Sequence, residues 1–394
     1  MDKKEMLATV SAGAMNRRQV NRGLAGAGLA AALALFGCGK KEEQQEQSQA
    51  PAQAPAQPTQ TAMAAIPTLH VLNWQGYGTD EAWAVKIFED RYKCKVVHDY
   101  FNSEPEMLTK LRTNPGVYDV VLINSSFTQQ AAKEGLIQSI DTSKITNWKD
   151  LTPALRDSPY LNTDGKTYGV SWVWGVTSFA YSTDVIKTPP DSIQELWNPA
   201  HAGHVGWRDD PEEAVQLAAI ATGQDPNNPT DMDKIKQKLL DLKPQLKTFW
   251  SSEDEWNKHM SSKDYDIATY WSGSAARSKK HFNLPVEFVI PKEGAIGWFD
   301  GLSIAAKAPN YDLAEEFIDF MVSPEFYVKW DTDVGAPASA NTAADNQLPA
   351  DAFNRVVMGP PDLQKRLFYM APLSDDRRKA YTELWEQVKT ELGK

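Results

Sequence analysis

The sequence predicts an α/β protein whose folded part is divided into two lobes. Segments with strand-like patterns alternate with helical segments of about 10–15 residues, which indicates parallel sheets joined by right-handed crossovers. About 328 residues follow Ile66, and this length exceeds what one hydrophobic core usually fills. Two similar phrases, YDV at 118–120 and YDI at 265–267, each follow a predicted helix and begin an apolar strand. Together these observations favour two lobes of similar design.

The first lobe is predicted from strands and helices that alternate regularly. Thr79 is the expected N-cap of the first helix, and Ser103 forms a capping box with Glu106 at the start of the second helix. The segments are, in chain order, strand 69–74, helix 79–93, strand 95–101, helix 103–113 and strand 118–124. The last strand is apolar enough to be buried on both faces.

The second lobe begins with the motif VGWRDDPEEAVQLAA at 205–219, which gathers four carboxylates within five positions. Asp210 suits an N-cap, Pro211 the first helical position, and Glu213 completes a capping box. This helix start accounts for the acidic residues without any ligand. The predicted segments are strand 204–209, helices 211–223, 232–243 and 251–260, and strands 265–271 and 286–291.

Residues 1–37 have the features of a bacterial lipoprotein export signal. A basic region at 15–18 precedes an uncharged run of 15 residues, Gly23 to Gly37, which is too short to span a bilayer. The run ends in LFGC at 35–38, which resembles a lipobox, so we expect Cys38 to be lipidated after cleavage. An ordinary signal peptide with an incidental cysteine is the alternative, and the choice between general and twin-arginine export stays open.

Residues 38–66 are predicted to form a disordered tether, because their Gln-, Ala- and Pro-rich sequence contains almost no large apolar groups. Cys94 is the only other cysteine, and we expect it to be a small buried side chain. Two cysteines cannot make a zinc cluster.

The chain is acidic, with 52 Asp+Glu against 41 Lys+Arg and a net charge of −11. This charge argues against a nucleic-acid partner and favours cationic cargo or simple solubility. His201 and His204 lack a third ligand in a zinc pattern, and the GKT at 165–167 lacks the upstream glycine of a phosphate loop. With no catalytic motif evident, the sequence predicts a protein that is not an enzyme and needs no metal or cofactor.

A binding site is predicted where the strands end, because ligands of open α/β sheets lie beyond the carboxyl ends of the strands. Three tryptophans, Trp74, Trp271 and Trp298, fall at such ends, close to carboxylates. Each tryptophan alone is more often a packing residue. Aromatic faces combined with fixed carboxylates, however, are the surfaces that bind an ammonium group well.

From about Thr68 onward, the chain resembles the spermidine/putrescine-binding family of ABC-transporter solute receptors. The phrases that carry the resemblance are LNWQGY, YDVVLINSSF, YGVSWVWGVTSFAYS, ELWNPAHAGHVGWRDDPEEA, YWSGSA and VIPKEGAIGWFDGLSIAAKAPN. It implies a two-lobed, periplasmic-binding-protein-like fold of type II, with parallel or mixed sheets flanked by helices and a ligand cleft between the lobes. The expected lobes comprise 67–172 with 299–344, and 173–298 with 345–394.

The resemblance also implies which residues bind the amine. The family's amine-binding positions fall on Trp74, Tyr77, Asn124, Asp210, Glu213, Trp271, Trp298 and Asp300. Asp210 and Glu213 would then both cap a helix and face the cleft. Gly76, Ser126, Ser274 and Ala336 depart from residues common in relatives, which implies a roomier or weaker pocket.

The expected function is a monomeric receptor, lipid-anchored through Cys38 at the periplasmic or extracytoplasmic face, that delivers a polyamine-like cation to an ABC permease of the inner membrane. Which amine it prefers stays open. A receptor for another cationic amine or for a carbohydrate is one alternative, and a non-transport amine sensor or scaffold is another.

Overall fold

The computed structural model describes residues 66–360 and 362–393. The predicted export signal, Cys38 and all of the predicted tether except Ile66 lie outside these residues. Within the described ranges, no helix is both long enough and apolar enough to cross a bilayer.

Most of the strands belong to a single sheet of 12 strands. The strands are β1 (Thr68–Asn73), β2 (Lys95–Tyr100), β3 (Val120–Asn124), β4 (Ile137–Gln138), β5 (Asn162–Thr163), β6 (Lys166–Thr167), β7 (Val170–Ser182), β8 (Val205–Arg208), β9 (Leu246–Trp250), β10 (Ile267–Trp271), β11 (Val286–Val289), β12 (Ala295–Ala305), β13 (Ala338–Ser339) and β14 (Leu367–Tyr369). The main path through the sheet runs β2-β1-β3-β12-β7-β10-β8-β9.

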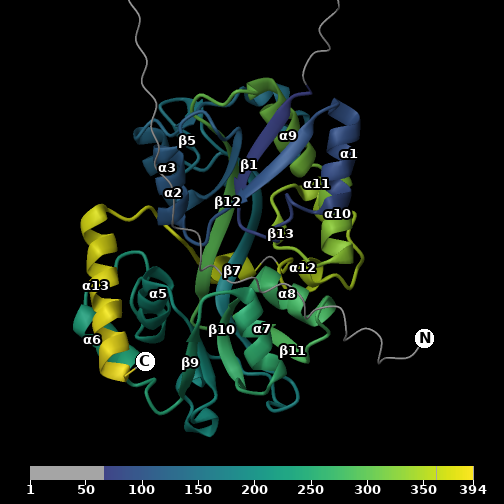
Figure 1. Cartoon of the computed structure of the whole chain (residues 1–394). Coiled ribbons are helices and arrows are strands. Elements are labelled where there is room, and N and C mark those ends of the chain that lie inside the picture. The colour runs from purple at the N-terminus through teal and green to yellow at the C-terminus, as the bar shows by residue number, and fades with distance from the viewer. Residues whose placement is uncertain (1–65, 361, 394) are drawn as a thin grey trace, which may run out of the picture. The chain divides into compact units, whose positions relative to one another are not determined.

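Helices flank this sheet (Figure 1). They are α1 (Ala82–Tyr92), α2 (Glu104–Thr113), α3 (Ser125–Lys133), α4 (Pro153–Arg156), α5 (Pro211–Ala221), α6 (Met232–Leu240), α7 (Glu253–Ser261), α8 (Ser272–Lys280), α9 (Tyr311–Met321), α10 (Pro324–Asp333), α11 (Thr342–Asp345), α12 (Phe353–Val356) and α13 (Asp375–Leu392). Short 3-10 turns are η1 (Thr142–Lys144), η2 (Thr146–Asp150), η3 (Ile193–Trp197), η4 (Pro199–His201) and η5 (Leu363–Arg366).

Two parallel sets of strands lie at the two ends of this path. In one set β1 pairs with β2 and β3 in parallel, and in the other β8 pairs in parallel with β9 and β10. The long strands β7 and β12 lie between the sets and run antiparallel to each other and to their neighbours on the main path, β10 and β3. Every residue of both long strands is buried. The expected mixed α/β sheet is therefore confirmed, and the predicted strands all fall on observed ones.

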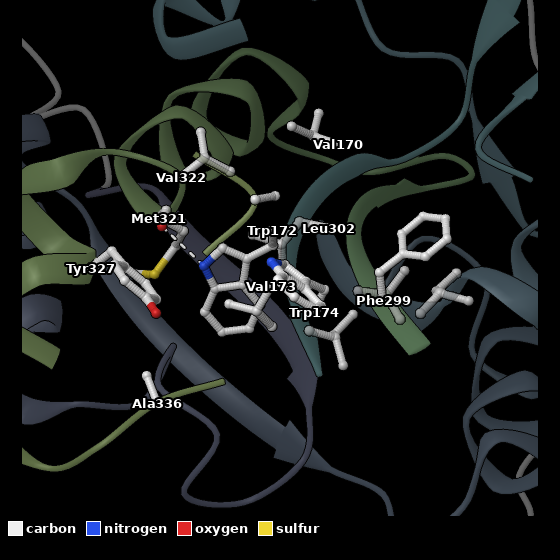
Figure 2. Close-up of a cluster of buried hydrophobic side chains, with 14 of the residues drawn as sticks. Val170, Trp172, Val173, Trp174, Phe299, Leu302, Met321, Val322, Tyr327 and Ala336 are labelled. Atoms are coloured by element: carbon white, nitrogen blue, oxygen red, sulfur yellow. Dashed lines mark hydrogen bonds between the residues drawn. The ribbon is translucent and has the colours of Figure 1, made fainter. Parts of the chain in front are cut away.

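The buried apolar side chains form two clusters, and the larger one includes residues of both sets of strands, such as Val71 of β1 and Tyr270 of β10. Figure 2 shows the larger cluster where β7 crosses it, with Trp172 and Trp174 among aliphatic and aromatic side chains. Both indole N–H groups are satisfied inside the core: Trp172 donates to the carbonyl of Met321 at 2.9 Å, and Trp174 donates to that of Ser339 at 3.0 Å. Cys94 is buried, as predicted.

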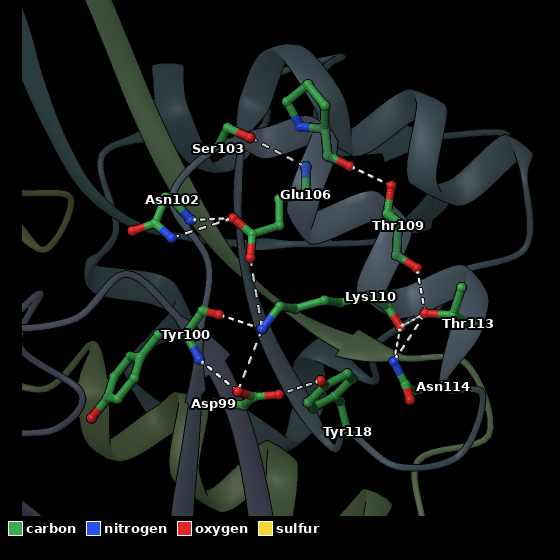
Figure 3. Close-up of polar contacts among 11 residues, drawn as sticks. Asp99, Tyr100, Asn102, Ser103, Glu106, Thr109, Lys110, Thr113, Asn114 and Tyr118 are labelled. Atoms are coloured by element: carbon green, nitrogen blue, oxygen red, sulfur yellow. Dashed lines mark hydrogen bonds and ion pairs between the residues drawn. The ribbon is translucent and has the colours of Figure 1, made fainter. Parts of the chain in front are cut away.

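Of the two N-caps predicted for the first lobe, the one at Ser103 is confirmed and the one at Thr79 is wrong. At α2 the Ser103 hydroxyl accepts from the Glu106 amide at 3.3 Å, as the capping box requires, while the Glu106 carboxylate reaches the Asn102 amide at 2.9 Å (Figure 3). The prediction that Thr79 caps α1 is wrong, because α1 begins at Ala82 without a side-chain cap. The Thr79 hydroxyl is instead buried and accepts from the side chain of Asn73 at 2.7 Å.

Candidate functional site

Four of the predicted site residues, together with Thr177, share one face of the central sheet. On β12, Asp300 lies opposite Asn124 of β3. Trp298 lies two residues before Asp300 on the same strand. Ile296 lies two residues before Trp298 and is opposite Thr177 of β7. Thr177 in turn lies opposite Trp271 of β10. Opposed residues, and residues two apart on a strand, point to the same face. The row therefore runs diagonally across four strands that lie far apart in the sequence.

Asp300 is held at one end of this row by neutral donors. The Tyr77 hydroxyl donates to its Oδ2 at 2.9 Å, and the Asn124 side-chain amide donates to its Oδ1 at 3.0 Å. Asp300 is only 7% exposed, and burial raises the pKa of its carboxyl to about 6, although the two hydrogen bonds oppose this shift. The site therefore places a carboxylate in a poorly solvated position where a cation would stabilise it.

The two donors to Asp300 are themselves fixed by their surroundings. Asn124 is the N-cap of α3, and its Oδ1 accepts from the amide of Ser126 at 3.0 Å and from the hydroxyl of Ser126 at 2.8 Å. Its side-chain amide N–H is thereby turned toward Asp300. The Tyr77 ring packs edge-on against Trp172 and Trp330, at centroid distances of 5.7 and 6.1 Å. Three predicted residues, Tyr77, Asn124 and Asp300, are thus brought together.

A second predicted group forms around Glu213 at the start of α5. Its Oε1 accepts from the indole N–H of Trp271 at 2.9 Å and from the hydroxyl of Thr177 at 3.3 Å. Asp210 caps the helix as predicted, accepting from the Glu213 amide at 2.9 Å. The predicted capping box is only half formed, because the Glu213 side chain is turned toward Trp271 and the Asp210 amide donates to the Arg208 carbonyl instead.

Arg208 joins this second group, although the sequence analysis did not single it out. Its Nε lies 3.3 Å from Glu213 Oε2, and its Nη2 lies 3.8 Å from Asp210 Oδ2. The guanidinium carbon also lies over the ring of Trp271, 4.2 Å from its centroid. Burial raises the pKa of Glu213, and the charge of Arg208 opposes that shift. The signal available in the sequence was its position at a strand end, two residues before Asp210.

The remaining two predicted tryptophans lie apart from direct hydrogen bonding to these groups. Trp298 is 8% exposed and fills the space left by Gly175, where an added Cβ would lie 2.3 Å from the indole ring. It stands on the sheet between Asp300 and Thr177. Trp74 packs edge-on against Phe101, with centroids 4.7 Å apart.

A further carboxylate that the sequence analysis missed lies beside Asp300. Glu104, in the first turn of α2, accepts from the Asn124 amide at 3.3 Å through Oε1. Burial, and next the charge of Asp300, raise the pKa of Glu104 well above its ordinary value. Its place in the first turn of a helix gave no signal beyond favourable capping chemistry.

Neither the two surface pockets nor any metal-binding group of the described residues coincides with the candidate site. Surface pockets of about 360 Å³ on α13 and about 110 Å³ beside Leu111 and Lys307 are lined by other residues. Among residues 66–360 and 362–393, no group of three or more His, Cys, Asp or Glu side chains is arranged to hold a metal ion.

Comparison with known proteins identifies the family. The family model of bacterial extracellular solute-binding proteins matches residues 83–354. The spermidine/putrescine-binding periplasmic protein of Escherichia coli is 30% identical over 300 residues, covering 74% of this chain and 83% of that protein. The putrescine-binding periplasmic protein PotF of the same species is 29% identical over 350 residues, covering 84% and 93%.

Solved structures agree on the fold. The crystal structure of the spermidine/putrescine ABC transporter substrate-binding protein PotD of Streptococcus pneumoniae superposes with a TM-score of 0.73 at 22% identity, covering 83% of this chain and 99% of that one. This likeness shows that the fold is that of the two-lobed periplasmic solute-binding proteins. The chain belongs to the family of bacterial extracellular solute-binding proteins.

Proposed function

We propose that this protein is an extracytoplasmic receptor that binds an amine of the spermidine/putrescine class and delivers it to an ABC permease. The observation that carries the proposal is Asp300, a buried carboxylate whose hydrogen-bond donors are both neutral. An ammonium group would supply the missing positive charge. The names of the relatives, which bind spermidine or putrescine, support the same class of cargo.

The spacing of the two acidic groups suits a ligand with ammonium groups at both ends. Glu213 binds Thr177, which lies opposite Ile296, four residues before Asp300 on β12. Four residues of strand correspond to about 13 Å. Trp298 stands between the two groups on the same face, where an indole would cover the methylenes of an extended amine.

The burial of the site requires that the ligand enter while the protein is open. Asp300 is only 7% exposed, so an amine reaches it when the two lobes move apart. The expected lobes, 67–172 with 299–344 and 173–298 with 345–394, meet within β7 and β12. A ligand that binds the closed form more tightly than the open form shifts the population toward closure, and the cargo undergoes no chemical reaction.

The proposal also includes a lipid anchor. Residues 1–37 would direct export, and the lipidated Cys38 would hold the receptor at the membrane through the tether at 38–66. The receptor would then act as a monomer near its permease, without a metal or cofactor.

The test is a thermal-shift and calorimetry screen with putrescine, spermidine, a neutral sugar and a neutral amino acid. A ligand at 100 times its Kd stabilises a one-site protein by about 2.7 kcal/mol, so binding of an amine gives a clear rise in melting temperature. Added salt should weaken binding, because ammonium and carboxylate attract each other by charge. Stabilisation by the sugar and not by either amine would contradict the proposal in favour of a carbohydrate receptor.

A further inference from the structure

Arg208 occupies the kind of place that an ammonium group of the cargo is expected to take. The order β10-β8-β9 sets Arg208, the last residue of β8, between Trp271 at the end of β10 and Trp250, its register partner on β9. Its guanidinium carbon lies 4.2 Å from the Trp271 ring centroid and 5.6 Å from that of Trp250. An aromatic face beside two carboxylates is already filled by the protein's own cation.

The pairing of Arg208 with Glu213 is buried and incompletely satisfied. The Arg208 side chain is 13% exposed and that of Glu213 is 12% exposed, with 3.3 Å between Nε and Oε2. The Nη1 atom of Arg208 is buried without a hydrogen-bond partner among the described residues. Solvent and salt screen such a charge poorly, so Arg208 acts on any cation bound nearby.

The other ionisable groups near Arg208 do not change the net charge of the candidate site. Arg277 forms an ion pair with Glu253 at 2.5 Å, and Arg378 forms one with Glu212 at 3.5 Å, so the charges within each pair cancel. Burial raises the pKa of Glu104 well above its ordinary value, which favours its neutral form. With Glu213 and Asp300 ionised, the charges of the candidate site are those of Asp210, Glu213 and Asp300 against that of Arg208, a balance of two negative charges.

We propose that Arg208 determines which amines the site accepts. Its positive charge leaves the site with a net charge that matches a cargo with two positive charges, and it repels the third ammonium group of a larger amine. This inference rests on the proposed function, since it concerns the selectivity of the same site. A diamine such as putrescine balances the site. A triamine such as spermidine brings an additional ammonium group into the field of the guanidinium, and like charges held close in a poorly screened site repel each other strongly.

The experiment compares the affinities of putrescine and spermidine for the wild-type protein and for Arg208→Gln by calorimetry at low salt. Removing one positive charge helps the triamine more than the diamine, so the ratio of spermidine affinity to putrescine affinity should rise about tenfold or more. The melting temperature of each free variant is measured beside it. An unchanged ratio in a folded Arg208→Gln protein that still binds amines would overturn the inference.

Three further variants separate charge from shape. Arg208→Lys keeps the positive charge and should keep the wild-type ratio. The double variant Arg208→Gln/Glu213→Gln restores the balance of two negative charges and should return the ratio toward the wild-type value. Arg112→Gln, which removes a surface arginine paired with Glu134, is the matched control and should leave both affinities unchanged.

Two other outcomes would contradict the inference, each for a different reason. If wild-type protein binds lysine, a diamine with a carboxylate, more tightly than putrescine, and Arg208→Gln abolishes that preference, Arg208 is a carboxylate ligand and the charge-matching inference is wrong. If wild-type protein binds no amine at all, the proposed function itself fails, and the inference fails with it.

Discussion

At the scale of single residues, the two acidic groups of the site differ in what neutralises them. Glu213 and Asp210 face the guanidinium of Arg208. Asp300 receives hydrogen bonds only from the neutral side chains of Tyr77 and Asn124. Because the cost of burying a charge falls mainly on the carboxylate without a cation, a ligand should gain most of its affinity at Asp300.

Replacing Asp300 by Asn should therefore abolish tight amine binding while the free protein stays folded. Loss of one partner of a buried charge pair costs about 2–5 kcal/mol, or roughly 30- to 5,000-fold in affinity. The free variant should tolerate the change, since an Asn amide can accept from Asn124 and donate to the Tyr77 hydroxyl. Calorimetry with putrescine and spermidine, beside the melting temperature of the free protein, measures both effects.

Glu213→Gln is the internal control for that variant. The Asp210 cap does not use the Glu213 side chain, so α5 should keep its start, and the amide can still accept from Trp271. Its loss of amine affinity should be smaller than that of Asp300→Asn, because Arg208 already neutralises Glu213. An affinity for amines within about threefold of wild type in Asp300→Asn, under about 0.7 kcal/mol, would mean that Asp300 is not an ammonium ligand.

The raised pKa of Asp300, about 6, predicts opposite effects of pH on binding and on stability. As the pH falls through about 6, the carboxyl gains a proton, so amine affinity should fall while the amines stay charged. A carboxyl whose pKa is higher in the folded than in the unfolded state stabilises the fold at low pH, and this contribution is lost as the pH rises through the folded value.

The measurement is calorimetry and thermal unfolding between about pH 5 and about pH 8, for wild type and Asp300→Asn. The melting temperature of the free variant should rise relative to that of wild type as the pH increases across this range. The same difference at both ends of the range would show that Asp300 ionises with an ordinary pKa.

At the scale of elements, the pair of long strands β7 and β12 positions the site. On these strands Trp298 lies opposite Gly175, and Thr177 lies opposite Ile296. The spacing of Asp300, Trp298 and Thr177 is therefore set by strand register rather than by loop conformation. The strand pair can hold Trp298 flat against the sheet only because β7 carries Gly175 at the opposing position.

Gly175→Ala should consequently displace the Trp298 indole and weaken both stability and amine binding. The added Cβ would lie 2.3 Å from the ring, far inside contact distance, and overpacking of this kind costs about 1–3 kcal/mol. The melting temperature and tryptophan fluorescence report the change. Gly301→Ala on β12 is the comparison, since its nearest neighbour is a Leu161 methyl at 3.3 Å, and it should destabilise less. Equal effects of the two substitutions would argue against a special role for the Gly175 position.

At the scale of the whole molecule, one continuous sheet runs through both sets of parallel strands by way of β7 and β12. Motion of the lobes would have to bend these two strands, since each contributes to both halves of the core. The N-terminal tether is predicted to be separate from this body, so anchoring and binding should be independent.

Replacing Cys38 by Ala should accordingly release the protein from membranes without changing its affinity for amines. A lipid anchor holds a protein through its buried acyl chains, and the predicted tether would separate that anchor from the site. Fractionation of cells after a high-salt wash, with calorimetry of the purified variant, tests both parts. A variant that still sediments with membranes would show that Cys38 is not the anchor.

The sequence by itself determined the strands and helices predicted within 69–124 and 204–291, the Ser103 and Asp210 caps, the buried Cys94 and the mixed α/β class, because these depend on periodicity and on contacts between near neighbours. The long central strands β7 and β12 were not among the predicted segments. It also carried the phrases by which the family could be recognised. The eight proposed ligand residues remain a prediction, and the structure brings six of them into two hydrogen-bonded groups.

Only the tertiary structure decided which partner each polar side chain takes. The local sequence around Thr79 is compatible with a helix cap, yet its hydroxyl accepts a hydrogen bond from Asn73. The Glu213 side chain accepts a hydrogen bond from Trp271 instead of completing the predicted capping box. Arg208 reaches Glu213 and stacks on Trp271, a residue from a strand far along the chain. Local sequence patterns predict hydrogen-bond partners only within about one turn of a helix. Strand order and register place polar groups from distant segments beside the same side chain. A buried polar group then pairs with the partner, near or distant, that best satisfies its hydrogen bonds.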